Sequence, residues 1–513
     1  RRVYIRLPLH WIVMRRKIIF LFLLIALFVA CAPPATFTPQ PPIAFTPPAN
    51  YTPTIFDIDV ESTASQERLS DSRPNIIVIM TDDQPFHTMA YMPTVITELI
   101  PNGVNFTNAF ATTPLCCPSR VSILTGEYAH NHQVLTNRMP MGGALKFNDA
   151  ITIATWMKDA GYRTAYYGKY LNDYEALEPS GYVPPGWDEW GVFLGKNLGE
   201  NEDAGNLQYY SNFSMSENGA IIEYRGQKVN FGADVVTQKS VDFINSARND
   251  PFFLFIGYYN PHSPYMAAPR HAETFRSGTG WDWFQYRPPN FNEEDIRDKP
   301  DYLNDISPLS LGELDAAHKR ILRSLLSVDD GVASVLNALN KTGLKEKTIV
   351  VFFSDNGATI GDHRFGVSKN CVYEACVKIP FVVYAPAFFE ARSEDRLIAN
   401  IDLAPTFIDI AGGSIPESID GLSLFPLFKN EPVTWREDIL LEHWPTEEGV
   451  GSMIPEFYSA RTMEWKYVEY VTGEKELYDL VNDPYELVNL AGKREYRDIE
   501  NELVMRLKEL KDE

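Results

Sequence analysis

The sequence predicts an α/β fold: a mostly parallel central sheet with helices on both faces, plus a small C-terminal antiparallel sheet with a helix. Short apolar runs rich in β-branched residues have the length and composition of strands buried on both faces. Segments of helical pattern alternate with these runs, and that alternation is typical of parallel strands covered by helices. The runs are Asn75–Met80, Thr164–Tyr167, Phe252–Ile256, Ile349–Phe353 and Phe381–Tyr384, and the helical segments are Asp149–Ala160, Ala233–Arg248 and Leu311–Leu339.

We place the main domain at residues 74–434. The segment 435–513 differs from it in the pattern of its predicted strands. Short polar strands are predicted at Tyr458–Arg461, Lys466–Tyr470 and Leu477–Tyr478, and an amphipathic helix follows at Arg494–Leu510. Short polar strands with one apolar face are typical of antiparallel sheets. We therefore expect a separate C-terminal subdomain.

Residues 1–31 carry an export pattern, in which basic residues 15–17 precede the apolar run Ile18–Val29. This run is the length of a signal peptide and too short to span a bilayer. Met14 directly precedes the basic residues, so residues 1–13 are interpreted as an over-extended start. The run ends in a sequence that resembles a bacterial lipobox, which predicts lipidation of Cys31. The alternative is soluble export after cleavage at Ala32.

Residues 32–73 are rich in Pro, Thr and Ser, a composition that forms an extended linker rather than a core. We therefore expect an exported lipoprotein of a bacterium, at the cell surface or in the periplasm, that meets the membrane through its lipid anchor only. The net charge of −22 in 513 residues excludes nucleic acid as a general partner, because nucleic acid needs a basic face. Five cysteines are too few for a disulfide scaffold. Cys371 and Cys376 either pair or remain buried thiols.

Polar residues follow four of the predicted strands at the point where each strand ends. Ligands of open α/β sheets bind beyond the carboxyl ends of the strands, so these residues are expected to form one site. Carboxylate and amide oxygens favour Ca²⁺ or Mg²⁺ over zinc. The alternative is that the acids only start turns. The residues concerned are Asp82, Asp83, Lys169, His262, Asp355 and Asn356.

Cys116 lies in the segment Pro114–Arg120, which continues to Leu124-Thr125-Gly126. Pro118 suits the first turn of a helix, so Cys116 is expected at or just before a helix N-terminus, where an anion is favoured. Arg120, one turn further on, can donate to that anion or to residue 116. From the residues alone, Cys116 is either a reactive thiolate or a buried structural cysteine.

The pattern C-x-P-S-R followed by L-T-G at Cys116 resembles the signature of the sulfatase family, in which the first Cys is oxidised to formylglycine by a maturase. The similarity extends over about residues 73–490. Its further segments are Arg73–Gln84, Ser354–Gly357, Asp402–Gly412, Asp420-Gly421 and Glu476–Asn489.

The resemblance implies a sulfuric ester hydrolase. Asp82, Asp83, Asp355, Asn356 and the formylglycine at position 116 would bind one Ca²⁺, with Mg²⁺ as an alternative. One hydroxyl of the hydrated aldehyde would attack sulfur, and the second would expel sulfate.

The resemblance also implies roles for side chains around the nucleophile. Lys169 and Lys369 would hold the sulfate oxygens, and His262 would protonate the leaving oxygen. His132 would be the basic neighbour of the nucleophile, with His130 as the alternative. His363 would lie near the site or one layer behind it.

The segment Gly168–Asn172 departs from the G-K-W-H found in many sulfatases, because Leu171 occupies the place of the His. That contact is absent or is replaced by Asn172. The G-K-Y-L-N form is similar to N-acetylglucosamine-6-sulfatases and heparan endosulfatases, which implies a sulfated amino sugar or glycosaminoglycan as substrate. Trp281, Trp283 and Tyr286 either stack on sugar rings or belong to the core.

Two rival functions are compatible with these residues. One is a phosphate or phosphonate monoester hydrolase of the same superfamily, working with the same nucleophile. The other is a catalytically inactive lipoprotein that binds sulfated glycans. The sequence does not decide the position of the sulfate on the sugar or whether cleavage is endo or exo.

Overall fold

The computed structural model describes residues 48, 51–56, 73–177, 181–194, 208–226, 230–247, 250–276, 285–304, 306–446 and 453–512. The signal peptide, Cys31, most of the linker, Trp281 and Trp283 therefore lie outside the described residues. The chain divides into the units Arg1–Ile43 and Ala44–Glu513, and all of the described residues belong to the second unit. Within the part of the chain that the structure describes, no helix is both long and apolar enough to cross a bilayer.

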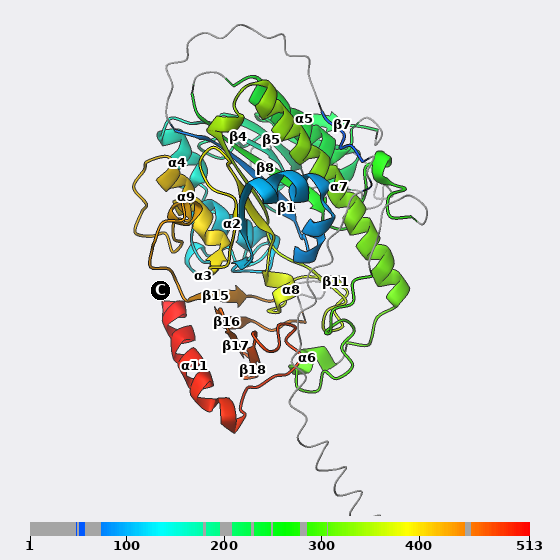
Figure 1. Ribbon diagram of the computed structural model, residues 1–513, viewed down its shortest axis with the longest axis vertical. Helices are drawn as coiled ribbons and strands as arrows, with labels where there is room; N and C mark the ends of the chain where they lie inside the picture. The colour runs from blue at the N-terminus through cyan, green and yellow to red at the C-terminus, as the bar shows by residue number, and fades with distance from the viewer. Residues whose placement is uncertain are drawn as a thin grey trace, which may run out of the picture. The chain divides into compact units, whose positions relative to one another are not determined.

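A large twisted sheet forms the centre of the fold (Figure 1), and its central strand is β1 (Asn75–Asp82). All eight residues of β1 are buried, and alternate residues enter two separate apolar clusters, one on each face of the sheet. In spatial order the ten strands among the described residues are β13 (Arg392–Glu394), β2 (Gly103–Phe106), β12 (Phe381–Tyr384), β9 (Thr348–Ser354), β1, β8 (Phe252–Pro261), β4 (Arg163–Gly168), β5 (Glu189–Leu194), β6 (Phe213–Glu217) and β7 (Ala220–Tyr224).

The strands β9, β1, β8, β4 and β5 run parallel to one another. The antiparallel members lie toward the two edges: β12 pairs with β9 and β2, and β6 pairs with β5 and β7. All five apolar runs of the sequence form strands of this sheet. The predicted mostly parallel α/β fold is therefore confirmed.

Helices cover both faces of the sheet, as expected from the two buried sides of β1. On one face, α2 (Cys116–Thr125), α4 (Ile153–Asp159) and α9 (Leu403–Ile410) share an apolar cluster with Val78. On the other face, α5 (Gly232–Asn245) and the long α7 (Leu311–Lys341) pack around Ile77 and Ile79. Shorter elements are β3 (Ala109–Phe110), β10 (Thr359–Ile360), β11 (Val367–Ser368), β14 (Ile398–Ala399), α3 (Ala129–His132), α6 (Asp301–Asn304), α8 (Glu374–Val377) and α10 (Phe425–Phe428).

The start of α4 differs from its expected position. The sequence predicts a helix from Asp149, whereas α4 begins at Ile153. Thr152 is the N-cap of α4, because its side chain accepts a hydrogen bond from the Ala154 amide at 3.3 Å. The side chain of Thr155 completes a capping box. A reciprocal cap of this kind stabilises one helix start over its neighbours.

The C-terminal sheet has the strands β15 (Asp438–His443), β16 (Phe457–Thr462), β17 (Trp465–Tyr470) and β18 (Lys475–Asp479), all antiparallel. Helix α11 (Arg497–Asp512) buries Leu503, Leu507 and Leu510 in the cluster of this sheet and is drawn in red in Figure 1. The expected antiparallel sheet with a helix is confirmed. The sequence prediction missed β15.

A buried ion-pair network joins this sheet to the main domain. The ammonium of Lys466, on β17, lies 2.6 Å from Glu486 and 2.9 Å from Glu374, the first residue of α8. Arg461 reaches the same Glu374 at 3.1 Å. Lys466 is fully buried. The network therefore holds the start of α8, five residues after Lys369, against the C-terminal sheet.

Replacing Lys466 by Met is expected to lower the free energy of unfolding by about 3–5 kcal/mol, because it leaves two buried carboxylates without their shared cation. Urea denaturation at pH 7.5 measures this. Lys475→Met is the matched control, since Lys475 is exposed and its pair with Glu469 at 3.2 Å is worth less than about 1 kcal/mol. An equal loss in both variants would contradict the network's role.

The ion pairs of Glu374 with Arg461 and Lys466 predict that the free energy of unfolding depends on pH. Burial alone would raise the pKa of Glu374, but Arg461 and Lys466 outweigh burial and hold it well below its usual value of 4.5. A depressed folded-state pKa gives stability that is present above about pH 4.5 and is lost as the pH falls. The difference in stability between wild type and Lys466→Met is therefore expected to shrink when both are denatured below pH 4.5.

Candidate functional site

The carboxyl ends of four neighbouring strands bring the predicted polar residues together. Strand β1 ends at Asp82 and is flanked by β8, which leads to His262, and by β9, which leads to Asp355 and Asn356. Strand β4, next to β8, leads to Lys169. Because these strands are parallel neighbours, residues up to 273 positions apart in the sequence reach hydrogen-bond contact, such as Asn356 Nδ2 to Asp83 Oδ1 at 2.8 Å.

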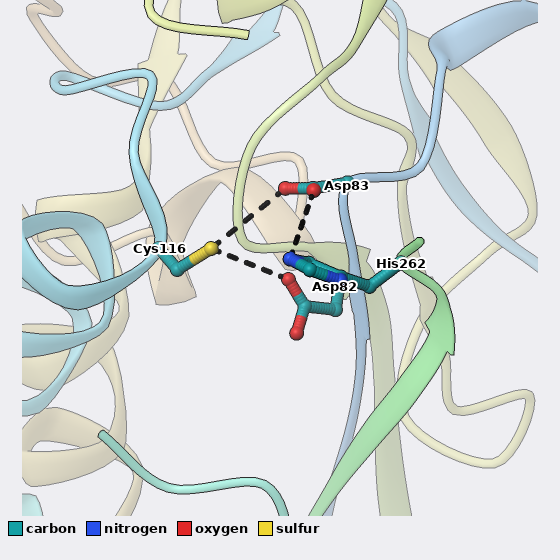
Figure 2. A group of neighbouring side chains, drawn as sticks. All are labelled: Asp82, Asp83, Cys116 and His262. Carbon is teal, nitrogen blue, oxygen red and sulfur yellow. Dashed lines mark hydrogen bonds and ion pairs between the residues drawn. The ribbon is translucent and has the colours of Figure 1, made fainter. Parts of the chain in front are cut away.

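Cys116 is the first residue of α2, and its side chain is fully buried. Its Sγ lies 3.4 Å from Asp82 Oδ1 and 3.8 Å from Asp83 Oδ1, and it accepts a hydrogen bond from Lys369 Nζ at 2.6 Å. Figure 2 shows Cys116, both aspartates and His262 converging on one point. Burial raises the pKa of the Cys116 thiol well above its usual range.

Each buried acid of the cluster has a cation of the same chain beside it. Lys369 Nζ lies 2.7 and 2.9 Å from the two oxygens of Asp83, and Lys169 forms an ion pair with Asp82. Burial would raise the pKa of Asp82, but Lys169 and its cationic neighbours outweigh burial and hold that pKa well below its usual range. Burial and the nearby charge of Asp82 raise the pKa of Asp355.

Arg120 points into the protein rather than into open space. Its Nε donates to Asp355 at 2.8 Å, its Nη1 donates to the carbonyl of Lys169 at 2.7 Å, and its Nη2 lies 3.4 Å from Asp82. One guanidinium thus joins helix α2 to the ends of three strands. These bonds use Nε and Nη1, whereas Nη2 is buried without a hydrogen-bond partner among the described residues. The expected contact with a bound anion or with residue 116 stays a prediction.

The residues present fit a hard divalent cation. Ligand atoms of Asp82, Asp83, Cys116 and His262 all lie within 4.8 Å of one another. Asn356 Oδ1 is buried and has no hydrogen-bond partner among the described residues, which is costly for a carbonyl oxygen unless a ligand completes it. Oxygen donors of this kind suit Ca²⁺ or Mg²⁺.

His262 contributes one ring nitrogen to the cluster. Its Nδ1 lies 2.9 Å from the carbonyl oxygen of Ser263 and therefore carries a proton, while Nε2 faces Asp83 at 3.6 Å. Burial lowers the pKa of His262. The neutral ring thus presents an Nε2 lone pair to the site, and a second proton there turns it into an acid.

The other predicted histidines lie outside the cluster. His132 engages Ser122 Oγ at 3.0 Å through Nε2 and accepts from the Val134 amide at 3.1 Å through Nδ1, and burial lowers its pKa to about 3. His130 pairs with Glu442 at 2.9 Å. The third, His363, is buried, lies 2.6 Å from Glu293 and stacks on Tyr373, one layer behind the site.

A pocket of about 440 Å³ opens beside the cluster. Asn172 lines it, whereas Leu171 is buried in the core. Its described lining residues are Asp83, Leu115, Thr136, Asn137, Arg138, Met139, Pro140, Met141, Asn172, His262, Ser263, Tyr265, Ala358, Val367, Ser368, Lys369, Asn370, Pro445 and Thr446. Tyr286 is absent from this lining: its hydroxyl donates to Asp362 at 2.8 Å and its ring stacks on His87 at 3.8 Å, so it is a packing residue.

The pair Cys371–Cys376 forms a disulfide, which decides between the two states left open by the sequence. One neighbour of the site was not predicted. Asn137 Oδ1 accepts the backbone N–H of Cys117 at 2.9 Å and so tethers the loop 134–143 to the start of α2. No motif marks Asn137, and only the tertiary structure identifies it.

The fold and the charged groups of the site define the class of protein. It is an α/β protein whose strand ends carry acids that suit a bound cation and lysines that suit an anionic group. A family model described as Sulfatase matches residues 74–414, and one described as N-sulphoglucosamine sulphohydrolase, C-terminal, matches residues 361–513. The chain belongs to the sulfatase family, a class of sulfuric ester hydrolases.

Relatives of known name agree with this assignment. N-acetylglucosamine-6-sulfatase of Homo sapiens is 32% identical over 83% of this chain and 84% of its own length. A putative extracellular sulfatase Sulf-1 homolog of Caenorhabditis elegans is 33% identical over 72% of this chain, which spans about half (53%) of that relative. The structure of BT4656 in complex with its substrate D-glucosamine-2-N,6-O-disulfate has a TM-score of 0.72 at 24% identity and covers 86% of this chain and 98% of its own, a likeness in fold.

Proposed function

We propose that this chain hydrolyses the sulfate ester of a sulfated amino sugar, of the N-acetylglucosamine-6-sulfate or glycosaminoglycan type, with a formylglycine made from Cys116 as the nucleophile. The observation that carries the proposal is the position of Cys116. It starts helix α2, with the Lys369 ammonium 2.6 Å from its sulfur, beside the buried Asp82 and the partly buried Asp83. A helix N-terminus and an ammonium group both favour a bound anion.

One divalent cation, Ca²⁺ or alternatively Mg²⁺, would be held by Asp82, Asp83, Asp355 and Asn356, with residue 116 as a further ligand. The unpartnered Asn356 Oδ1 and the clustered carboxylates of Asp82 and Asp83 support this ligand set, and Asp355 lies beside them, where its Oδ1 accepts the Asp83 amide. When bound, the ion supplies Lewis-acid chemistry: it lowers the pKa of an oxygen nucleophile and neutralises developing charge.

Conversion of Cys116 would require a formylglycine-generating maturase as a partner. The hydrated aldehyde supplies two hydroxyls on one carbon, one for attack on sulfur and one for release of sulfate, whereas a serine supplies only the first. Cys117 stays out of this chemistry, because its side chain is buried in the apolar cluster against the sheet.

The remaining roles belong to side chains around the cluster. Lys169 and Lys369, which pair with Asp82 and Asp83, would donate to sulfate oxygens once a metal neutralises those acids. His262, through Nε2, would protonate the leaving oxygen. Arg120 would hold α2 against the strand ends. If His132 acts as the base beside the nucleophile, its ring must first break its hydrogen bonds to Ser122 and Val134.

The names of the relatives support the substrate and the location. An N-acetylglucosamine-6-sulfatase and a structure bound to a glucosamine disulfate favour a sulfated amino sugar. Relatives named as extracellular sulfatases favour an exported protein. The proposed organisation is a lipoprotein signal peptide ending at Cys31, a linker over 32–73, a catalytic domain over 74–434 and a C-terminal subdomain over 435–513.

Ion chromatography of sulfate released from N-acetylglucosamine 6-sulfate tests the proposal, on protein co-produced with a maturase and supplied with Ca²⁺. Sulfate release is expected, and kcat/KM for nitrophenyl sulfate is expected to exceed that for nitrophenyl phosphate by at least about tenfold. Faster phosphate hydrolysis would favour the phosphohydrolase alternative. Glycan binding without any turnover, on protein whose residue 116 is converted, would favour the inactive lipoprotein.

A further inference from the structure

One cation in the wall of the pocket has no acidic partner among the described residues. Four titratable side chains with formal or possible charge line it: Asp83, Lys369, His262 and Arg138. Asp83 pairs with Lys369 at 2.7 Å and faces His262 at 3.6 Å, so those charges are compensated within the cluster. Among the described residues, the Arg138 guanidinium has neither an ion-pair nor a hydrogen-bond partner.

Some exposed arginines of the described chain pair with acids, such as Arg225 with Glu223, whereas Arg138 and Arg497 have no acidic partner among the described residues. What distinguishes Arg138 is its place in the lining of the pocket beside Cys116. A planar guanidinium presents several N–H donors in a fork that matches carboxylates and sulfate-like groups. Arg138 therefore offers an anion-binding group that the cluster around Cys116 does not use.

The loop that carries Arg138 is tied to the nucleophile's helix. The neighbouring Asn137 accepts the Cys117 amide at 2.9 Å, and Thr136 Oγ1 donates to the carbonyl of Arg138 at 2.9 Å. The Arg138 backbone therefore keeps a set position relative to residue 116. A pre-arranged position lowers the entropy lost on binding and favours recognition of one ligand geometry.

Two asparagines in the wall of the same pocket each hold a buried side-chain oxygen without a partner among the described residues. Asn370 Oδ1 and Asn172 Oδ1 are buried and lack hydrogen-bond partners in the described part of the chain, and both residues line the pocket. Asn370 is 7% exposed, and its backbone amide donates to Pro114 O at 3.0 Å, two residues before Cys116. Buried unpaired acceptors are costly, and hydroxyl or N–H groups of a ligand relieve that cost.

We propose that Arg138 binds a second anionic group of the substrate, distinct from the sulfate that is cleaved, while Asn172 and Asn370 accept hydrogen bonds from the sugar. The inference rests on the proposed function and adds a preference for sugars that carry a second negative charge. An N-sulfate on the same ring and the carboxylate of an adjacent hexuronic acid share the required chemistry. Arg138 is thus a specificity-determining residue.

Isothermal titration tests this without turnover, in full-length Cys116→Ala protein loaded with Ca²⁺. The three ligands are N-acetylglucosamine 6-sulfate, glucosamine 2-N,6-O-disulfate, and a disaccharide of hexuronic acid and N-acetylglucosamine 6-sulfate. We expect at least one two-anion ligand to bind more tightly than the singly charged one. Adding Arg138→Met is expected to reduce that preference about 10- to 100-fold. Arg497→Met, at an exposed arginine that starts α11, is the matched control and is expected to leave the preference unchanged.

The ligand whose advantage disappears identifies the source of the anion. A loss confined to the disulfate assigns the N-sulfate, and a loss confined to the disaccharide assigns the carboxylate. Equal weakening of all three ligands, or no preference in the protein with Arg138 intact, would overturn the inference. If the preference depends on Arg138 but the converted enzyme releases no sulfate, the subsite stands and the proposed function fails.

Discussion

Replacing Cys116 by Ala is expected to reduce sulfate release roughly 10⁴- to 10⁶-fold, to the level of the uncatalysed reaction in the binding site. The reason is that residue 116 alone would supply the attacking oxygen. Its side chain lies 3.4 Å from Asp82 and 2.6 Å from Lys369, and no other thiol or hydroxyl among the described residues is recorded in contact with both. Initial rates on N-acetylglucosamine 6-sulfate measure the loss.

Cys117→Ala is the matched control, because Cys117 is the adjacent buried thiol of the same helix and belongs to the apolar cluster. It is expected to keep activity within about tenfold, since it loses one small core side chain rather than the nucleophile. Peptide mass spectrometry is expected to find the aldehyde at position 116 and an unmodified thiol at 117. Full activity in Cys116→Ala protein would contradict the nucleophile assignment.

Removing divalent metal with a chelator is expected to abolish activity and to lower the melting temperature by about 2–5 °C, and Ca²⁺ is expected to restore both. The physical reason is that the carboxylates of the buried Asp82 and Asp355 lie near the partly buried Asp83, with Asp355 Oδ1 accepting the Asp83 amide at 3.1 Å. In the absence of an ion, Lys169, Lys369 and Arg120 supply the only compensating charge recorded among the described residues.

Asn356→Ala tests the ligand set by thermal shift, a readout that does not depend on turnover. Removing the unpartnered Oδ1 is expected to weaken Ca²⁺ binding about 10- to 100-fold and to move the Ca²⁺ titration to higher concentration. Asn337→Ala, on α7 and away from the site, is the control and is expected to leave the titration unchanged. Parallel titrations with Mg²⁺ decide between the two ions. A melting temperature insensitive to both ions would argue against the metal site.

The parts of the site that lie within short motifs were predictable from the sequence. The run Asn75–Met80 predicts a buried strand, and Asp82 and Asp83 follow it directly, so their place at the sheet edge needs only local information. Pro118 similarly predicts that Cys116 starts a helix, as α2 does. Strand and helix signals extend over only a few residues. A site residue in or next to such a signal can therefore be placed as reliably as the strand or helix itself.

The partners of individual side chains were not predictable in the same way. The expected contact of Arg120 with an anion or residue 116 stays a prediction, but no sequence pattern indicated its bonds to Asp355 and to the carbonyl of Lys169. His132 was expected beside the nucleophile, but its ring engages Ser122 and Val134. A side chain selects its partner from all groups that packing brings within reach, and those groups come from distant parts of the chain.

By itself, therefore, the sequence determined the α/β class, the C-terminal sheet and the family, because each depends on local apolar patterns and on contiguous motifs. The tertiary structure decided which charges neutralise each other around Cys116, that Cys371 and Cys376 pair, and that Arg138 lines the pocket without an acidic partner in the described part of the chain. The physical reason is that ion pairing and burial act over a few ångströms of space, whatever the separation along the chain.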